Sequence, residues 1–210
     1  MKIFVNILMM LTAMCFIIAQ VQWKVNTSLI TFSIKNGGFI VKGSFDGLIA
    51  DIKFDPANYS KSVIDASVDV NTINTGINMR NNHLKKEEYF DAAKFPRITL
   101  KSTSFSKEKD GAFKGHFKLL MKGVTKDIVI PFSCKESKNT AVFNGTFTLK
   151  RKDYGIGGNS LTMADDVTVT IIINTTKAQQ SIMGIGQINK TNKYDESKYW
   201  NNSLPHSVSF

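Results

Sequence analysis

Residues 113–132 read FKGHFKLLMKGVTKDIVIPF, and this stretch decides the fold. The apolar residues Phe113, Phe117, Leu119 and Met121 occupy odd positions, whereas Lys114, His116 and Lys118 occupy even positions between them. Gly123 ends this run, and a second alternating run follows it. Because successive side chains of a β-strand point to opposite faces, the stretch predicts two antiparallel strands joined by a tight turn, each with one apolar face.

The same alternation recurs along most of the chain. The apolar residues of the other runs are Ile30, Phe32 and Ile34; Phe39, Val41 and Phe45; Leu48, Ala50, Ile52 and Phe54; Ile64, Ala66, Val68 and Val70; Ile98 and Leu100; Phe143, Phe147 and Leu149; and Val167, Val169, Ile171 and Ile173. They change from odd to even positions after Asp46-Gly47, which indicates a β-bulge within one long strand. We therefore predict an all-β fold of eight antiparallel strands, and the long strands with short turns favour an up-and-down barrel over a two-sheet sandwich.

One segment breaks the strand pattern. Residues 80–100, RNNHLKKEEYFDAAKFPRITL, begin charged and helical and end as a strand. Thr75 and Asn78 are candidate caps for a helix that begins near Met79, and Pro96 stops it. Leu84, Tyr89 and Phe90 can form an apolar patch on this short helical insert. We expect the insert at one open end of the barrel, either as a lid over apolar side chains or as a plug that completes the core.

The chain divides into three regions. Residues 1–19 have a positive start and a long apolar run, which is typical of a cleavable secretory signal peptide, with an uncleaved anchor as the alternative. Residues 20–176 form the predicted barrel. Residues 177–210 are rich in Asn, Lys and Ser and are expected to be a poorly ordered polar extension. This organisation predicts a periplasmic or secreted protein.

The chain is basic, with 27 Lys and Arg against 17 Asp and Glu and a formal net charge of +10. Such a charge favours transient contact with an anionic membrane surface. The basic residues are spread along the chain, and no nucleic-acid-binding motif is found, so a nucleic-acid partner is not expected. The oligomeric state stays open, and a dimer is one option.

The sequence offers little for catalysis. Its three histidines, His83, His116 and His206, share no metal-ligand spacing, and neither a nucleophile elbow nor a phosphate-binding loop is found. Cys134 is the only cysteine outside the expected signal peptide, and its place in a strand-like run favours a buried, inert thiol. We therefore expect no enzyme activity, no metal and no cofactor.

Several motifs, taken in order, resemble the YceI-like family of secreted, polyisoprenoid-binding proteins. They are Trp23 at the start of the domain; Phe32, Ile34 and Lys35, then Gly43, Phe45 and Gly47; TINTGINMRNNHLKKEEYFDAAKFPRITLKSTSF, residues 72–105; GHFKLLMKGVTKDIVIPF, residues 115–132; and RKDYGI, residues 151–156, for the family's R-x-D-F-G-I. The chain departs from the family at Asn81, where Asp is usual, and at Asn36, where His is common.

The resemblance implies a lipocalin-like barrel that binds a polyisoprenoid, an isoprenoid quinone or a similar amphiphilic long-chain lipid and transports it without catalysis. From the alternation, the residues expected to line the cavity are Phe32, Ile34, Phe39, Val41, Phe45, Ala50, Ile52, Ala66, Val68, Ile98, Leu100, Phe117, Leu119, Ile130, Phe143, Phe147, Val169 and Ile171. Arg80, His83 and Arg151 are the candidates for contact with a polar head group at the mouth.

Other interpretations stay open at this point. Arg80 could instead pair with Asp153 or Asp91, and His83 could pack at the helix end. Phenylalanines could fill the centre of the barrel, which would leave a ligand-free, stress-related interaction protein. An enzyme acting on a lipid or quinone would need converging polar groups inside the cavity, and the alternation offers almost none.

Overall fold

The computed structural model describes residues 21–178, so the expected signal peptide and residues 179–210 of the expected extension lie outside the described part. The strands are β1 (Gln22–Asn36), β2 (Phe39–Phe45), β3 (Ile49–Lys53), β4 (Val63–Asp69), β5 (Arg97–Lys107), β6 (Phe113–Met121), β7 (Val124–Ser137), β8 (Thr140–Lys150) and β9 (Met163–Lys177). The helices are α1 (Asn78–Leu84) and three short 3-10 helices, η1 (Tyr59–Lys61), η2 (Val70–Thr72) and η3 (Arg151–Tyr154).

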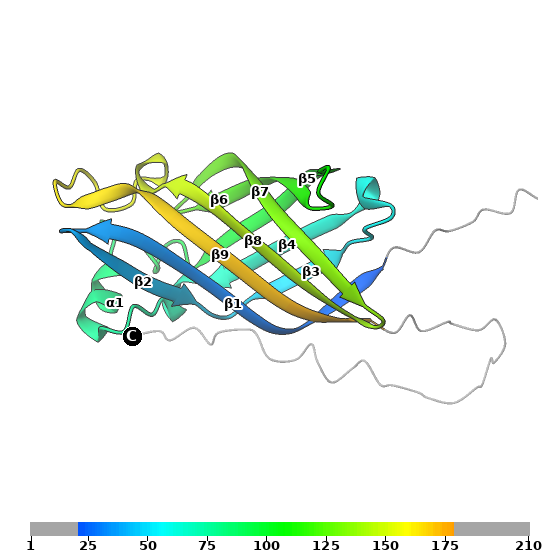
Figure 1. Ribbon diagram of the computed structural model, residues 1–210. Helices are drawn as coiled ribbons and strands as arrows, with labels where there is room; N and C mark the ends of the chain where they lie inside the picture. The colour runs from blue at the N-terminus through cyan, green and yellow to red at the C-terminus, as the bar shows by residue number, and fades with distance from the viewer. Residues whose placement is uncertain (1–20, 179–210) are drawn as a thin grey trace, which may run out of the picture. The chain divides into compact units, whose positions relative to one another are not determined.

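Eight of these strands, β1 and β3 to β9, close into an antiparallel up-and-down barrel, which confirms the predicted fold class (Figure 1). Each strand from β3 to β9 pairs with its neighbour in sequence. β1 closes the barrel because it pairs with β9 along almost its whole length and with β3 through Gln22 and Trp23. The closed ladder leaves β2 as a ninth strand outside the barrel, where it forms a hairpin with β1.

The expected bulge at Asp46-Gly47 is instead a break between two strands. Residues 46–48 leave the ladder, and Gly47 has a φ of +67°, a left-handed conformation that favours glycine. As a result, β2 pairs with β1, whereas β3 pairs with β4. The single long strand expected from the sequence is therefore two strands, because a change of partner requires the chain to turn, whereas a bulge keeps the same partner.

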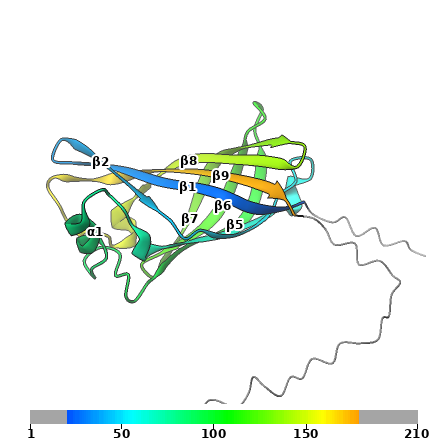
Figure 2. The same cartoon turned by 90° about the horizontal axis from the view of Figure 1, so that it is seen from below.

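The helical insert lies where β2 has left the barrel wall, between the β1–β2 hairpin and the start of β5 (Figure 2). α1 ends at Leu84, well before Pro96, and the chain continues through turns to β5. The expected caps are wrong: Ile77 is the N-cap residue and makes no side-chain capping bond. The Thr75 N–H and hydroxyl donate instead to Asn81 Oδ1, at 2.8 and 2.6 Å.

The end of the barrel opposite α1 is filled by aromatic side chains. Phe54 is fully buried, and its ring lies edge-on to the rings of Phe105, Phe113, Phe132 and Phe143 at centroid distances of 5.0 to 5.8 Å. We call these five residues the aromatic plug. Beside it, the buried indole of Trp23 donates from Nε1 to the Phe54 carbonyl at 2.8 Å and lies edge-on to the Phe143 ring.

Candidate functional site

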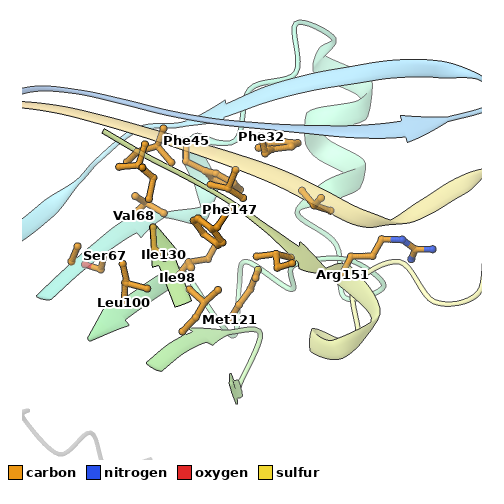
Figure 3. Close-up of a pocket in the computed structure, with 18 of the residues that line it drawn as sticks. Phe32, Phe45, Ser67, Val68, Ile98, Leu100, Met121, Ile130, Phe147 and Arg151 are labelled. Atoms are coloured by element: carbon orange, nitrogen blue, oxygen red, sulfur yellow. The ribbon is translucent and has the colours of Figure 1, made fainter. Parts of the chain in front are cut away.

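A cavity of about 360 Å³ occupies the barrel between the aromatic plug and the end that carries α1, which we call the mouth. Inward side chains of all nine strands line it, together with residues of the helical insert. Figure 3 shows Phe45, Ile98, Met121 and Phe147 converging on this space from four different strands. The volume lies within the range of about 300 to 1,000 Å³ that is usual for small-molecule sites, and the lining is almost entirely apolar.

Most of the residues predicted to face the interior lie on the cavity wall. Those that line it are Phe32, Ile34, Val41, Phe45, Ile52, Ala66, Val68, Ile98, Leu100, Phe117, Leu119, Ile130, Phe143, Phe147, Val169 and Ile171. They come from every strand of the barrel, because each strand places alternate side chains inward, and also from β2, which supplies Val41 and Phe45.

Two predicted residues do not line the cavity. Phe39 is 78% exposed, because it is the first residue of β2 and stands at the tip of the β1–β2 hairpin, beyond the barrel wall. Ala50, on β3, packs against the cluster around Trp23 and Phe54. Alternation assigned both residues to the correct face of a strand, but it carried no information about where along the barrel axis the cavity ends.

The cavity has further lining residues that the prediction missed. Ile30, Ile64, Met121, Phe132, Leu149, Val167 and Ile173 line it from the strands, Leu48 lines it from the break between β2 and β3, and Leu84, Tyr89 and Phe90 line it from the insert. The strand residues follow the same alternation and could have been found from it. Ile156 and Met163, by contrast, come from the η3–β9 segment and the start of β9, where the sequence gives no periodic signal.

Small residues explain only part of the free space. Ala66 on β4 and Gly145 on β8 line the cavity. A Cβ atom at Gly115 would lie 2.3 Å from the Phe117 ring, so this ring already fills the space above the glycine. Phe117 therefore forms part of the cavity floor next to the aromatic plug, where its ring lies edge-on to that of Phe105.

The insert covers the mouth and leaves the space beneath it open. Phe90 meets the Phe45 ring edge-on at 5.6 Å, and Leu84 and Phe90 pack on the cluster of Ile30, Phe45, Val68 and Ile73. Since Leu84, Tyr89 and Phe90 also line the cavity, the insert has both expected roles: it completes the packing at the mouth and forms a lid.

Arg80 and His83 both lie at the cavity mouth. Arg80 donates from Nε to Thr75 Oγ1 at 2.8 Å and from Nη2 to the Thr75 carbonyl at 2.7 Å, so the alternative of an ion pair with Asp153 or Asp91 is wrong. Within residues 21–178, Arg80 Nη1 makes no hydrogen bond, which leaves donors available to a ligand. The exposed imidazole of His83 packs against the Tyr89 ring at 4.8 Å.

Arg151 has a structural role that the sequence did not reveal. It is 2% exposed and donates from Nε to Ala164, from Nη1 to Ile156 and Gly158, and from Nη2 to Met163, in each case to a backbone carbonyl. Its Nη2 also pairs with Asp165 at 3.2 Å. These contacts use all five N–H donors of the guanidinium, which Figure 3 shows turned away from the labelled cavity residues. Arg151 is therefore not available for a head group, although its side chain lines the cavity.

Burial changes the acidity of two groups near the cavity. The pKa of the Cys134 thiol is raised to about 12, mainly by burial and secondarily by Glu136. The pKa of Tyr154 is also raised to about 12, by burial and then by Asp153. A thiol this weakly acidic stays protonated near neutral pH and is a poor nucleophile, as expected from the sequence.

Two searches of the described residues gave negative results. Within residues 21–178, no group of three or more His, Cys, Asp and Glu side chains is placed to hold a metal ion. In the same part of the chain, no helix combines the length and apolar character that crossing a membrane requires.

Comparison with known proteins decides the family. A model of the YceI-like domain matches residues 22–175, which span the barrel from β1 to β9. The chain belongs to the YceI-like family. Within this YceI-like domain, the departure at Asn81 has a local use, because its side-chain oxygen accepts both hydrogen bonds from Thr75. The other departure, Asn36, lies at the cavity mouth.

Curated relatives of this YceI-like chain come from several bacteria. A UPF0312 protein of Vibrio cholerae serotype O1 is 29% identical over 138 residues, which are 60% of this chain and 71% of the relative. A UPF0312 protein of Yersinia pestis is 29% identical over 133 residues, or 63% of this chain and 66% of the relative.

Solved structures share the fold of the YceI-like domain. Burkholderia cenocepacia BcnA has a TM-score of 0.70 at 23% identity, over 73% of this chain and all of that one. The Campylobacter jejuni YCEI protein has a TM-score of 0.59 at 27% identity, over 66% and 86% of the two chains. A polyisoprenoid binding domain from Saccharophagus degradans has a TM-score of 0.60 at 16% identity, over 76% and 99%.

Proposed function

We propose that this YceI-like protein binds one amphiphilic long-chain lipid, of the polyisoprenoid or isoprenoid-quinone type, and carries it through an aqueous compartment without catalysis. The observation that carries the proposal is the apolar cavity of about 360 Å³ that stays open between the aromatic plug and the lid. The description of the Saccharophagus degradans structure as a polyisoprenoid binding domain agrees with it. An expected signal peptide would place the carrier in the periplasm or outside the cell.

The hydrophobic effect supplies the affinity in this proposal. Burial of an aliphatic chain against apolar walls gains roughly 0.8 kcal/mol for each methylene removed from water. An extended lipid tail fits the cavity because residues from every strand surround its axis and the plug limits its depth. Loss of the tail's conformational freedom offsets part of this gain, so affinity depends on chain length as well as on the burial of each carbon.

The polar end of the lipid would stay at the mouth. Arg80 Nη1 can donate to a phosphate, hydroxyl or quinone oxygen there, and His83 stands next to it on α1. The cavity wall away from the mouth is apolar, and we infer that it holds the lipid without reacting with it.

The test begins with the native protein. The exported form is purified without detergent and extracted with organic solvent, and the extract is examined by mass spectrometry. Recovery of one long-chain isoprenoid lipid near one molecule per protein is the expected result. A clean extract, together with no uptake of added geranylgeraniol, would refute the carrier and favour the ligand-free interaction protein.

A matched pair of variants separates cavity binding from adsorption to the outside. Ala66→Phe places a ring in the cavity and should reduce geranylgeraniol uptake by about tenfold or more, because the tail and the ring need the same space. Val129→Phe adds the same ring to an exposed position on the outer face of β7 and should leave uptake unchanged. Equal uptake by both variants would show that the lipid binds elsewhere.

A further inference from the structure

Large apolar side chains are exposed around the mouth. Phe39 and Ile40 lie at the tip of the β1–β2 hairpin, where Phe39 is 78% exposed. Ile77 and Met79 lie at the start of α1, where Met79 is 83% exposed. Leu161, in the segment between η3 and β9, is fully exposed. We call these five residues the mouth face.

The three segments that carry the mouth face lie at the same end of the barrel. The Gly37 N–H donates to the Thr162 carbonyl at 3.0 Å, which joins the β1–β2 hairpin to the η3–β9 segment. α1 lies at this end in both ribbon views, and its residues Arg80 and His83 line the same cavity as Asn36 and Met163 (Figures 1 and 2). Exposed apolar side chains scattered singly are ordinary on proteins, but their gathering around the opening of an apolar cavity indicates an interaction surface.

Basic residues outnumber acidic ones in these segments. Residues 35–42, 74–86 and 156–162 contain Lys35, Lys42, Arg80, Lys85 and Lys86, and the exposed Glu87 and Glu88 follow directly. None of these basic side chains forms an ion pair within residues 21–178. A surface with apolar side chains and unpaired cations suits the interface of a bilayer that contains anionic lipids, where the cations meet head groups and the apolar groups enter the acyl boundary.

We propose that the mouth face docks on the surface of an anionic lipid bilayer, with Phe39, Met79 and Leu161 inserted at the level of the head groups. This orientation points the cavity opening at the membrane, so a lipid tail can move between bilayer and cavity without crossing water. The movement of lipid between bilayer and cavity rests on the proposed function. Docking itself follows from exposure and charge.

The experiment measures sedimentation of the full chain with two kinds of vesicle, phosphatidylcholine alone and phosphatidylcholine mixed with phosphatidylglycerol. We expect binding to the anionic vesicles and a decrease of that binding as salt is added, because surface charges are screened. The variant that combines Phe39→Asp, Met79→Asp and Leu161→Asp should bind the anionic vesicles more weakly, by about tenfold or more. Val129→Asp, which changes an exposed apolar residue on the barrel wall, should bind like the unaltered protein.

The controls distinguish the competing results. All variants share residues 1–20 and 179–210, so any contribution of those segments to vesicle binding is common to them, and circular dichroism checks that each variant is folded. No binding to anionic vesicles, or an equal loss in Val129→Asp, would overturn the proposal. So would a dimer in analytical ultracentrifugation that the triple variant abolishes, because a second copy would then cover the mouth face. If the Ala66→Phe variant binds vesicles but takes up no lipid, the docking proposal stands independently of lipid uptake.

Discussion

At the scale of one residue, the buried Tyr154 hydroxyl destabilises the fold. Tyr154 is 2% exposed, and among the described residues its hydroxyl is the buried side-chain polar atom that lacks a hydrogen-bond partner. Removal of an unsatisfied buried polar group relieves a desolvation cost of about 1–3 kcal/mol. We therefore expect Tyr154→Phe, which introduces the residue of the family pattern, to raise the free energy of unfolding by about 1 kcal/mol in urea titrations.

Tyr59→Phe is the control for this prediction. Tyr59 is only partly buried, and its ring packs against Phe113 at the other end of the barrel, so loss of its hydroxyl should change stability little. A Tyr154→Phe variant less stable than the unaltered protein would mean that the hydroxyl has a partner and contradict the assignment.

The raised pKa of the Cys134 thiol makes the free energy of unfolding depend on pH. Its pKa is about 12 in the folded protein, whereas an unfolded thiol titrates near 8.5. Between these values the unfolded chain binds fewer protons than the folded one, so stability present below about pH 8.5 is lost as the pH rises, by up to about 1.4 kcal/mol per pH unit. Urea unfolding at about pH 8 and about pH 10.5 should show this decline, and Cys134→Ala should make it shallower.

The comparison between variant and parent protein is needed because other groups, such as Tyr154, also change with pH in alkali. Their contributions are shared by both proteins and cancel in the difference. An identical decline with and without the thiol would show that Cys134 meets more water in the folded protein than its position on β7 implies.

At the scale of elements, Asn81 holds α1 to the chain that precedes it. Its Oδ1 accepts from the N–H and the hydroxyl of Thr75, and Arg80 contacts the same threonine. Asn81→Ala leaves the buried Thr75 N–H without a partner and should lower the free energy of unfolding by about 1–3 kcal/mol. Asn81→Asp keeps the acceptor oxygens beside a guanidinium and should stay within about 1 kcal/mol of the parent.

Urea unfolding measures both Asn81 variants, and hydrogen exchange of residues 74–84 shows whether the lid loosens. Asn82→Ala on the exposed face of α1 is the matched control and should behave like the parent protein. If Asn81→Ala and Asn82→Ala lower the free energy of unfolding by the same amount, the two Thr75 hydrogen bonds do not anchor the insert.

The insert also shows how far local sequence signals reach. The charged segment correctly indicated a short helix between two strands, and Leu84, Tyr89 and Phe90 were correctly grouped. The expectation that Pro96 stops this helix was wrong, because α1 already ends at Leu84. The position of the caps was wrong, because Thr75 donates from its N–H and its hydroxyl to the side chain of Asn81, which lies within α1. Capping preferences describe isolated helix ends and do not register such a contact.

At the scale of the whole molecule, a carrier should be stabilised by its cargo. A ligand that binds only the folded protein at about one hundred times its dissociation constant adds about 2.7 kcal/mol. For a domain of this size, we expect geranylgeraniol to raise the midpoint of thermal unfolding of the delipidated protein by about 5 °C or more. Differential scanning calorimetry measures the shift.

Ala66→Phe gives the complementary result in the same instrument. The ring fills part of the cavity, so the ligand-free variant should melt no lower than its parent, and added lipid should shift it little. Geranylgeraniol that raises the midpoint of both proteins equally would contradict binding in the cavity.

The sequence by itself determined the strands and their faces, because alternation is a local consequence of strand geometry that each run carries within itself. It therefore also placed Phe32, Ile98 and Phe147 on the inner wall. Only the tertiary structure decided which half of the barrel is filled, because the aromatic plug forms where side chains from distant strands meet at one height along the axis. Phe39 is exposed because it stands at the tip of the β1–β2 hairpin, beyond the barrel wall. The donors of Arg151 are saturated by residues 156–165, where the sequence gives no alternating pattern from which these contacts could be predicted.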